Sequence, residues 1–330
     1  MKDRPAGLDE RALRDILGAW GIGAVSLDYA PVGFGDYHWV AADADGPRWF
    51  VTVADLTQKG PVEEGSAESG LRQAMDTAVA LREQGLDFVV APLATGRGES
   101  LRLLGERHAV SVFPLVHGRT GDFGESLAAG ERAAVVEMLA ELHRTGAPAS
   151  TPVRPLRIPA RDRLEDAIQA SGGGWQGGPY AEPARALVAG CAGRLRERLD
   201  EFDRRADEVR GEQLVVTHGE PHPGNLVLAD GGPLLVDWDT VGLALPERDL
   251  WLVADGPDDL ARYADITGRR PDPEIMDLYR LRWAIEDVAL YVDDFRRPHE
   301  SGADSRQAWE ALTDTVRGLV EQVAEARKGG

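Results

Sequence analysis

The sequence predicts an α+β fold with two lobes, a small β-rich lobe at the N-terminus and a larger, mainly helical lobe at the C-terminus. At 330 residues the chain is longer than one small hydrophobic core requires, which favours two lobes. Short runs rich in β-branched and aromatic residues gather before residue 115, whereas long helical patterns follow residue 118. The composition, 43% hydrophobic and 28% charged, is that of an ordinary folded globular protein.

The N-terminal lobe has the pattern of a sheet with two helices. One helix is expected over residues 8–22, and another over 67–84, where apolar residues recur on one face and Gly85 can end the helix. The strand-like segments are residues 24–32, 37–42, 48–53, 88–93, 100–104 and 108–113. Turn residues at 33–36 (Gly-Phe-Gly-Asp) and at 45–47 (Asp-Gly-Pro) predict hairpins between the first three strands.

The C-terminal lobe alternates long helical patterns with one short β-rich stretch. Helices are expected over 130–145, over 183–210 and over most of 245–324, with a loop at 146–160. Between the last two helical regions lie an apolar strand at 214–217, a loop at 218–225, and a hairpin formed by 226–228 and 234–237.

The charge balance disfavours one class of partner and favours another. The chain has 37 basic and 56 acidic side chains, a formal net charge of −19. Such a surface repels nucleic-acid phosphates, so nucleic acid is not an expected partner, whereas a cationic small molecule would be attracted. The lysines are Lys2, Lys59 and Lys328, so any chemistry that requires a lysine has three candidates.

A reducing cytoplasm is the expected compartment, with no membrane partner. No apolar run approaches the roughly 18 residues that span a bilayer. Residues 1–5 lack the apolar segment of a secretory signal. The single cysteine, Cys191, excludes an internal disulfide and a multi-thiolate zinc site.

The segment 214–250 carries most of the chemistry. Its polar side chains, which follow short apolar strands, are His218, Glu220, His222, Asn225, Asp237 and Asp239. Oxygen ligands of Asn and Asp suit Mg²⁺, which takes few protein ligands and completes its shell with phosphate oxygens. The competing interpretation is a polar loop shaped by its turn residues, Pro221, Pro223 and Gly224.

Three motifs in this segment resemble those of the aminoglycoside phosphotransferases, which share the bilobal protein-kinase-like fold. The family loop H-G-D-x-H-x-x-N corresponds to residues 218–225, read here as HGEPHPGN. The family strand ending in I-D-W-D corresponds to 236–239 (VDWD), and Pro-x-x-Asp-Leu to 246–250 (PERDL). PERDL and the helix RWAIEDVALYVDDF make the spectinomycin phosphotransferase branch the most similar one.

The resemblance implies a division of the chain into lobes. It makes residues 1–113 the nucleotide-binding N-lobe, 114–118 the hinge, and 119–330 the helical C-lobe with the catalytic loop and substrate site. Asn225 and Asp237 would hold Mg²⁺ against the phosphates of ATP or GTP, and Glu220 would accept or orient the proton of the substrate hydroxyl. His218 would brace the loop, and Asp249 would anchor it.

The resemblance also implies contacts to the nucleotide from the N-lobe. The hairpin residues Gly33, Gly35 and Asp36 would cap the phosphates, although a lone G-x-G is equally a plain turn. The backbone of residues 113–116, from Phe113 to Val116, would meet the adenine edge.

Two positions depart from the family pattern. Glu220 stands where the family has Asp, and its extra methylene moves the carboxylate by about one bond length. Thr52 stands where the family strand carries its phosphate-binding lysine, and a threonine supplies no positive charge. Lys59 would replace it only if the following loop folds back. Arg72, on the next helix, is the alternative replacement, unless its side chain reaches solvent at the helix edge.

The helix expected over 275–297 suggests the substrate side. Glu286 and Asp287 lie on adjacent acidic stripes that flank Trp283. Aromatic faces beside carboxylates suit an amine-bearing sugar or cyclitol, while a solvated acidic face is the simpler interpretation.

The resemblance, together with these observations, implies a Mg²⁺-dependent O-phosphotransferase that moves the γ-phosphate of a nucleotide to a hydroxyl of an aminocyclitol or aminoglycoside-like compound. Such an activity would serve antibiotic resistance or self-protection. The alternatives are a kinase of a natural-product intermediate or precursor peptide, and a pseudokinase that binds without transfer.

Overall fold

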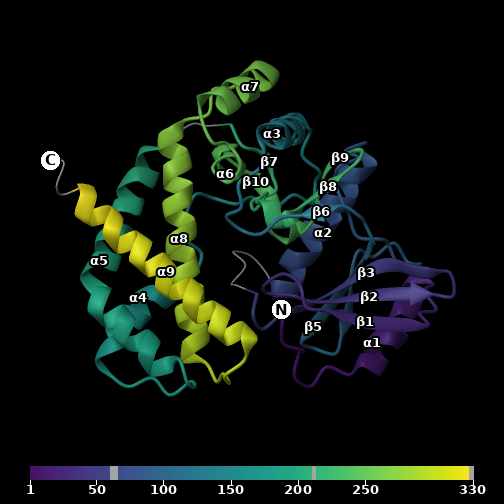
Figure 1. Cartoon of the computed structure of the whole chain (residues 1–330), viewed down its shortest axis with the longest axis horizontal. Coiled ribbons are helices and arrows are strands. Elements are labelled where there is room, and N and C mark those ends of the chain that lie inside the picture. The colour runs from purple at the N-terminus through teal and green to yellow at the C-terminus, as the bar shows by residue number, and fades with distance from the viewer. Residues whose placement is uncertain (60–65, 210–212, 327–330) are drawn as a thin grey trace. The chain divides into compact units, whose positions relative to one another are not determined.

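The computed structural model describes residues 1–59, 66–209 and 213–326 (Figure 1). The chain packs as two compact units, one formed by Met1–Pro155 with Gln213–Asp272, the other by Leu156–Glu212 with Pro273–Gly330. This division by packing differs from the division into lobes, because residues 119–155 and 213–272 pack with the N-terminal sheet's unit.

A five-stranded antiparallel sheet in the order β1-β2-β3-β5-β4 dominates the start of the first unit. Its strands are β1 (Ser26–Ala30), β2 (Tyr37–Asp43), β3 (Gly46–Asp55), β4 (Arg102–Leu104) and β5 (His108–Pro114). Trp39, Val51 and Val112 are fully buried, and one face of the sheet forms a core with helix α1 (Glu10–Ile16) and the 3₁₀ turn η1 (Leu17–Trp20).

The helix expected over 67–84 is present as α2 (Ala67–Glu83). The Ser66 hydroxyl caps it by accepting from the Ser69 N–H at 3.2 Å. Leu71, Met75 and Leu81 are buried, and Gly85 follows the helix with a φ of +95°, a left-handed conformation of the kind that commonly ends helices.

The prediction of a strand over residues 88–93 is wrong. Val89 makes only an isolated bridge with Leu235, whose backbone also bonds to Phe88 and Val90. Leu93 instead donates its N–H to the Val112 carbonyl. The segment is apolar because it passes from one sheet to another, and it joins neither as a regular strand.

Two small ladders hold the segment that carries the motifs. A three-stranded sheet has the order β6 (Arg119–Thr120), β8 (Leu226–Ala229) and β9 (Gly232–Leu235), and β7 (Val215–Thr217) pairs with β10 (Gly242–Ala244). The structure contains the predicted hairpin as β8–β9, whereas β10 lies outside every expected strand. Helix α3 (Ala129–Arg144) packs against β7, and α6 (Glu247–Leu250) and α7 (Pro257–Thr267) complete the unit.

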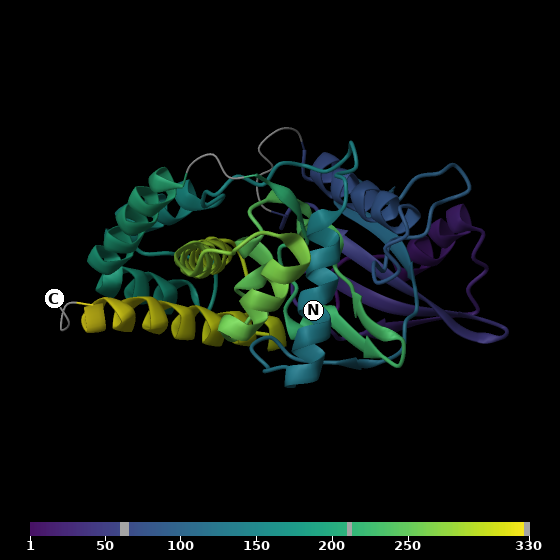
Figure 2. The ribbon, with the colours of Figure 1, turned by 90° about the horizontal axis from the view of Figure 1, so that it is seen from above.

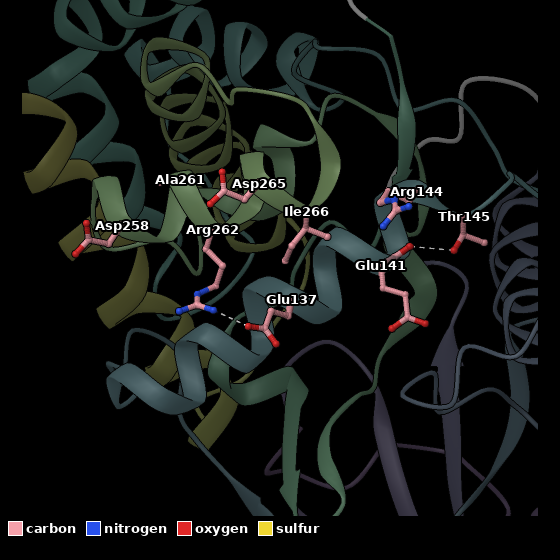
Figure 3. Close-up of a pocket in the computed structure, with 9 residues that line it drawn as sticks. All are labelled: Glu137, Glu141, Arg144, Thr145, Asp258, Ala261, Arg262, Asp265 and Ile266. Atoms are coloured by element: carbon pink, nitrogen blue, oxygen red, sulfur yellow. Dashed lines mark hydrogen bonds and ion pairs between the residues drawn. The ribbon is translucent and has the colours of Figure 1, made fainter.

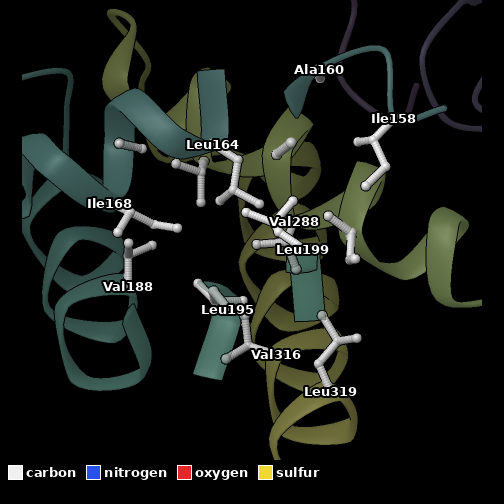
Figure 4. Packing of buried hydrophobic residues seen from close by; sticks show 14 of the residues in the cluster. Ile158, Ala160, Leu164, Ile168, Val188, Leu195, Leu199, Val288, Val316 and Leu319 are labelled. Atoms are coloured by element: carbon white, nitrogen blue, oxygen red, sulfur yellow. The ribbon is translucent and has the colours of Figure 1, made fainter. Parts of the chain in front are cut away.

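The second unit is a bundle of α4 (Arg161–Gln169), α5 (Ala181–Glu208), α8 (Pro273–Arg296) and α9 (Ala303–Ala326). Figure 2 shows α8 nearly end-on, between α5 and α9. Leucine, isoleucine and valine side chains fill the core of the bundle (Figure 4). The helix expected over 183–210 ends at Glu208, residue 210 lies outside the described residues, and α4 is absent from the sequence-based expectations.

Within the described ranges, no helix has both the length and the apolar content that a membrane span requires.

Candidate active site

The loop between β7 and β8 is built around His218, which is fully buried. One ring nitrogen, Nδ1, accepts the N–H of Glu220 at 3.2 Å, and Nε2 donates to the Val236 carbonyl at 2.9 Å. The ring also meets Trp238 edge to face, with centroids 4.8 Å apart. Burial lowers the pKa of His218 to about 4, so the ring is neutral near pH 7 and one nitrogen can accept while the other donates.

Asp249 fixes the backbone at the start of this loop. Its carboxylate accepts the N–H groups of His218 and Gly219, at 2.8 and 2.6 Å, and bonds to His143 Nε2 at 3.0 Å. Although burial acts to raise the pKa of this carboxyl, the hydrogen bond and charge of His143 together with Arg248 hold it below its usual value. The other nitrogen of His143 lies 2.9 Å from the Tyr263 hydroxyl, so the support extends to α3 and α7.

A second support comes from Arg248, which lies beside Gly219. Its guanidinium donates to Thr217 Oγ1 at 2.8 Å and to the Thr240 carbonyl at 2.9 Å, and the Thr240 hydroxyl donates to the His218 carbonyl at 2.9 Å. Gly219 has a φ of +105°, and a Cβ on it would lie 2.3 Å from the guanidinium. This position therefore requires glycine.

Asn225 ends the loop in a 3₁₀ turn, Pro223–Asn225. Its side-chain amide donates to the Glu220 carbonyl at 3.0 Å, and its own backbone carbonyl accepts the Val236 N–H at 3.0 Å. His222 caps the turn by accepting the Gly224 N–H at 3.1 Å. Because the amide nitrogen is engaged, the amide oxygen is the side-chain atom of Asn225 that remains to bind a cation.

Asp237 follows β9 with φ 64° and ψ 69°, a left-handed backbone conformation that residues other than glycine rarely adopt. Such a strained backbone is typical of functional positions. The residue is exposed, and its carboxylate makes no hydrogen bond or ion pair with the described part of the chain. The surrounding protein, then the charges of Asp239 and Asp36, raise the pKa of Asp237 well above its usual value.

Lys59 places an ammonium group among these acids. Its Nζ lies 2.8 Å from Asp239 Oδ2 and 2.9 Å from Asp36 Oδ1. A turn after β3 aims the residue here: the Asp55 carboxylate accepts the N–H and hydroxyl of Thr57, at 3.0 and 2.7 Å, and the Asp55 carbonyl accepts the Lys59 N–H at 3.3 Å. Although burial acts to lower the pKa of Lys59, Asp239 and Asp36 raise it well above 10.5, so the side chain is charged.

The donor set fits a magnesium ion. The charges of Asp239 and Asp36 raise the pKa of Asp237, and Lys59 pairs with Asp36 and Asp239, so a bound divalent cation would stabilise the charged form of Asp237. The described residues contain no group of three or more His, Cys, Asp or Glu arranged as a complete metal cage. Mg²⁺ does not need one, since it is commonly held by one or two carboxylates together with substrate phosphates.

The strand position expected to matter for phosphates carries no charge. Thr52 Oγ1 lies 3.2 Å from His38 Nδ1, and burial, then the positive charge of the N-terminus, lowers the pKa of His38 to about 3. Arg72 pairs with Glu68 one turn earlier on α2, at 2.9 Å, and reaches the Leu101 carbonyl at 3.5 Å. Neither residue is brought to the aspartates by these contacts, and their roles toward a nucleotide stay predictions.

The remaining nucleotide-side candidates lie on the sheet's connections. Gly33 and Gly35 form the β1–β2 turn with φ values of +69° and +103°, and Asp36 ends it beside Lys59. Phe113 pairs with Phe50 at the end of β5, and Val116 follows in the segment whose Leu115 N–H donates to the Arg48 carbonyl. Their predicted contacts to the nucleotide remain predictions.

The substrate-side candidates belong to the second unit. Trp283, Glu286 and Asp287 are half-buried on α8, and Glu286 pairs with Arg282 at 3.0 Å. Asp293, seven residues after Glu286, pairs with Arg163 at 2.7 Å and with Arg297 at 2.6 Å. Glu286 and Asp293 are therefore already paired with arginines, and contact with a substrate stays a proposal.

A separate hollow of about 980 Å³ lies between α3 and α7 (Figure 3). Charged side chains line most of it, among them Glu141, Arg144 and Asp265, and Arg262 pairs with Glu137 across it at 2.7 Å. None of the sequence-predicted site residues lines this hollow. Acidic and basic side chains are mixed along its wall, and no residue of the segment 214–250 lines it.

Sequence reasoning named His218 and Asp249 as supports of the loop but missed three others. His143 and Tyr263 come from helices expected only for packing, and Arg248 lies within PERDL without an assigned role. The scarcity of lysines is the signal that draws attention to Lys59, which the structure joins to Asp239 across 180 residues of sequence.

Comparison with known proteins gives one family and a set of related folds. The model of the phosphotransferase enzyme family matches residues 33–284. Protein StrN of Streptomyces griseus is 31% identical over 297 residues, covering 87% of this chain and 85% of that protein. A spectinomycin phosphotransferase in complex with ADP and spectinomycin has a TM-score of 0.72 at 16% identity, covering 94% of this chain and 97% of that chain.

A second solved structure, an amicoumacin kinase in complex with AMP-PNP, Ca²⁺ and Ami, has a TM-score of 0.63 at 13% identity, covering 95% of this chain and 93% of that chain. At such identities the structural likeness shows the fold alone. It confirms the predicted kinase-like combination of a β-rich N-terminal sheet with a helical C-terminal part.

Proposed function

The chain belongs to the phosphotransferase enzyme family, and we propose that it moves the γ-phosphate of Mg-ATP or Mg-GTP to a hydroxyl of an aminocyclitol or aminoglycoside-like compound. Membership of this family makes the chain a nucleotide-dependent phosphotransferase. Its acceptor, its metal and its choice of nucleotide are what we propose.

One observation carries the proposal furthest: a rigid loop presents Glu220 beside a strained, exposed aspartate. The backbone next to Glu220 is held by His218 and Asp249, and the charge of Glu220 is close enough to contribute to the raised pKa of Asp237. A proton acceptor on a hydrogen-bonded loop near a cation-binding carboxylate is what transfer to a hydroxyl requires, since phosphoryl transfer is catalysed mainly by positioning and electrostatics.

The transfer is a direct displacement at phosphorus. The substrate oxygen forms a bond to the γ-phosphorus while the bond from that phosphorus to the β,γ-bridging oxygen breaks, which leaves the nucleoside diphosphate. The hydroxyl proton passes to the Glu220 carboxylate. Because the substrate oxygen itself attacks the phosphorus, no phosphorylated protein is formed. His218 keeps the Glu220 N–H in a hydrogen bond of 3.2 Å and thereby limits the motion of that residue.

Asn225 and Asp237 are the residues that would hold the metal, through an amide oxygen and a carboxylate. Mg²⁺ held there would neutralise negative charge on the nucleotide phosphates. The protein's part is to keep these two ligands in place, which the Val236 hydrogen bond to Asn225 does at 3.0 Å.

A cationic acceptor agrees with the chemistry of the chain. The net charge of −19 attracts amines over long distances, and α8 carries Trp283 on the same helix as Glu286 and Asp287. Phosphorylation of an antibiotic hydroxyl would serve resistance or self-protection.

Thermal unfolding with and without Mg-ATP or Mg-GTP tests the nucleotide part of the proposal. A ligand at 100 times its dissociation constant stabilises by about 2.7 kcal/mol. At roughly 2 °C per kcal/mol for a chain of this size, the midpoint should rise by about 5 °C. We expect the shift to need magnesium and to be lost in Asp237→Asn.

The acceptor part is tested by incubating hydroxylated amines with Mg-nucleotide and following the gain of one phosphoryl group by mass spectrometry. Transfer to an aminocyclitol in preference to a serine- or threonine-containing peptide supports the proposal. No thermal shift with either nucleotide would contradict it and favour a pseudokinase role.

A further inference from the structure

The strand that should supply a cation for the phosphates supplies none. Thr52 on β3 is paired with His38 at 3.2 Å, and His38, with a pKa of about 3, is neutral near pH 7. Arg72 is paired with Glu68 at 2.9 Å on its own helix. A nucleoside triphosphate carries several negative charges, so a site without a cation for them would bind it weakly.

An ammonium group is nevertheless present among the aspartates. The Lys59 side chain is about three-quarters covered, with 24% of it exposed, and it bridges Asp36 of the β1–β2 turn and Asp239, two residues after Asp237. These two carboxylates come from the two segments expected to face the phosphates. Arg154, another cation near Asp239, donates to backbone carbonyls of Val241 and Asp239, at 3.3 and 3.5 Å.

We infer that Lys59, in the connection after β3, is the phosphate-binding cation of this protein, and that Asp36 and Asp239 hold it in place while no nucleotide is bound. The inference rests on the proposed function. The cation then lies seven residues after Thr52, the strand position, and the turn from Asp55 to Lys59 makes this geometrically possible.

The bridge predicts an exchange of partners. A divalent cation beside Asp237 and Asp239 competes with the ammonium for the same negative charge, and phosphate oxygens offer the ammonium new anionic partners. Lys59 therefore opposes binding of a metal ion alone and favours binding of the metal together with a nucleotide. A merely structural ion pair would not give these opposite effects.

Lys59→Met is the test, because methionine keeps the length of the side chain and removes its charge. We expect the affinity for Mg-ATP or Mg-GTP, whichever the parent protein binds, to fall about ten- to a hundredfold, as for loss of charge-assisted hydrogen bonds. Titration with Mn²⁺ alone, followed by its paramagnetic effect on water, should show an affinity several-fold higher than that of the parent protein. Lys59→Arg, which keeps a cation, should restore most of the nucleotide affinity.

Arg161→Met is the matched control. Arg161 also lies between two carboxylates, Glu165 at 2.7 Å and Asp203, but in the helical bundle of the second unit. Neither the nucleotide affinity nor the Mn²⁺ affinity of this variant should change. Thermal unfolding of each free variant shows that it is folded before binding is compared.

The outcomes separate this inference from the proposed function. If the parent protein binds neither nucleotide, both are overturned. If the parent protein binds nucleotide and Lys59→Met binds it equally well, only the assignment of Lys59 is wrong. The assignment is also wrong if the affinities for Mn²⁺ and nucleotide fall together in Lys59→Met, or if Arg72→Met alone loses nucleotide affinity.

Discussion

Replacement of Asp249 by asparagine is a small change in shape, but it should lower both the stability of the protein and the activity of the candidate active site. Asp249 is fully buried, and its two oxygens accept the N–H groups of His218 and Gly219 and a bond from His143. Asparagine has nearly the same shape, but one oxygen becomes an NH₂ donor. In either orientation of the amide, a donor then faces at least one backbone N–H of the loop.

The magnitude follows from these contacts. A buried donor left without an acceptor costs about 1–3 kcal/mol, and the charge-assisted bond to His143 at 3.0 Å loses part of its strength as the negative charge disappears. We expect Asp249→Asn to lower the free energy of unfolding by about 2–4 kcal/mol at pH 7, measured by urea denaturation. Because the disturbed N–H groups belong to the loop, nucleotide-dependent transfer should fall as well.

The pH dependence checks that the charge of Asp249 is the cause. Its folded pKa lies below 3.8, so its stabilising effect is present above the pKa of the unfolded chain and disappears as the pH falls through the folded value. The difference between Asp249→Asn and the parent protein should therefore be largest near neutrality and shrink in acid.

Asp259→Asn is the control for this prediction. Asp259 is also buried, and it accepts from Arg132 at 2.7 Å and from the Asp255 N–H at 2.9 Å, away from the loop. This variant should lose stability without a selective loss of transfer. An Asp249→Asn protein within about 0.5 kcal/mol of the parent protein, or one with full transfer activity, would refute the reasoning.

Two further predictions concern the same loop. The pKa of His218 falls from 6.5 to about 4 on folding, so the unfolded chain takes up a proton first as the pH drops. The free energy of unfolding should therefore decline by up to about 3 kcal/mol between pH 7 and pH 4. Urea denaturation of His218→Gln should show a shallower decline. Gly219→Ala places a methyl group 2.3 Å from the Arg248 guanidinium at a φ of +105°, so it should lower the thermal midpoint by several degrees, whereas Gly130→Ala, with no atom within 4 Å of the added Cβ, should not.

The N-terminal sheet was predictable because its information is local. In β2 and β3, buried Trp39, Val51 and Val53 alternate with less buried neighbours, and Gly-containing turns separate the strands. The residues on one face of α2 and Gly85 after it define that helix in the same way. Each signal lies within about twenty residues of the element that it predicts.

Elements that depend on distant partners were not predictable. The segment 88–93 is as apolar as a strand, but its partners are Leu235 and Val112, on two different sheets. Strand β10 is three residues long, and only pairing with β7 makes it a strand. Helix α4 is short, and its apolar residues Leu164, Ala167 and Ile168 are buried only because the other helices of the second unit pack against them.

In the candidate site, too, some residues were predictable from local sequence and others depend on distant partners. Asn225 follows Glu220 within one loop, and Asp237 lies at the end of one hairpin, so each is part of a short motif. Some supports of the loop lie in motifs, as His218 and Asp249 do, but His143 precedes Asp249 by 106 residues. The motifs therefore identify the groups that would react and two of their supports, while the more distant supports are found only in the folded chain.

Lys59 shows why a missing residue at one motif position is weak evidence for a missing function. At the position of Thr52, an isolated comparison finds no cation and suggests a protein that binds without transfer. Yet the negative charges of Asp36 and Asp239 need a positive charge nearby, and any part of the chain can supply it. A turn at residues 55–59 brings an ammonium to within 2.9 Å of both carboxylates. Electrostatics constrains the charge at a point in space and not the residue number that supplies it. A neutral Thr52 beside a neutral His38 is then the expected counterpart of a charged Lys59, because a second cation on β3 would lie near the first and repel it.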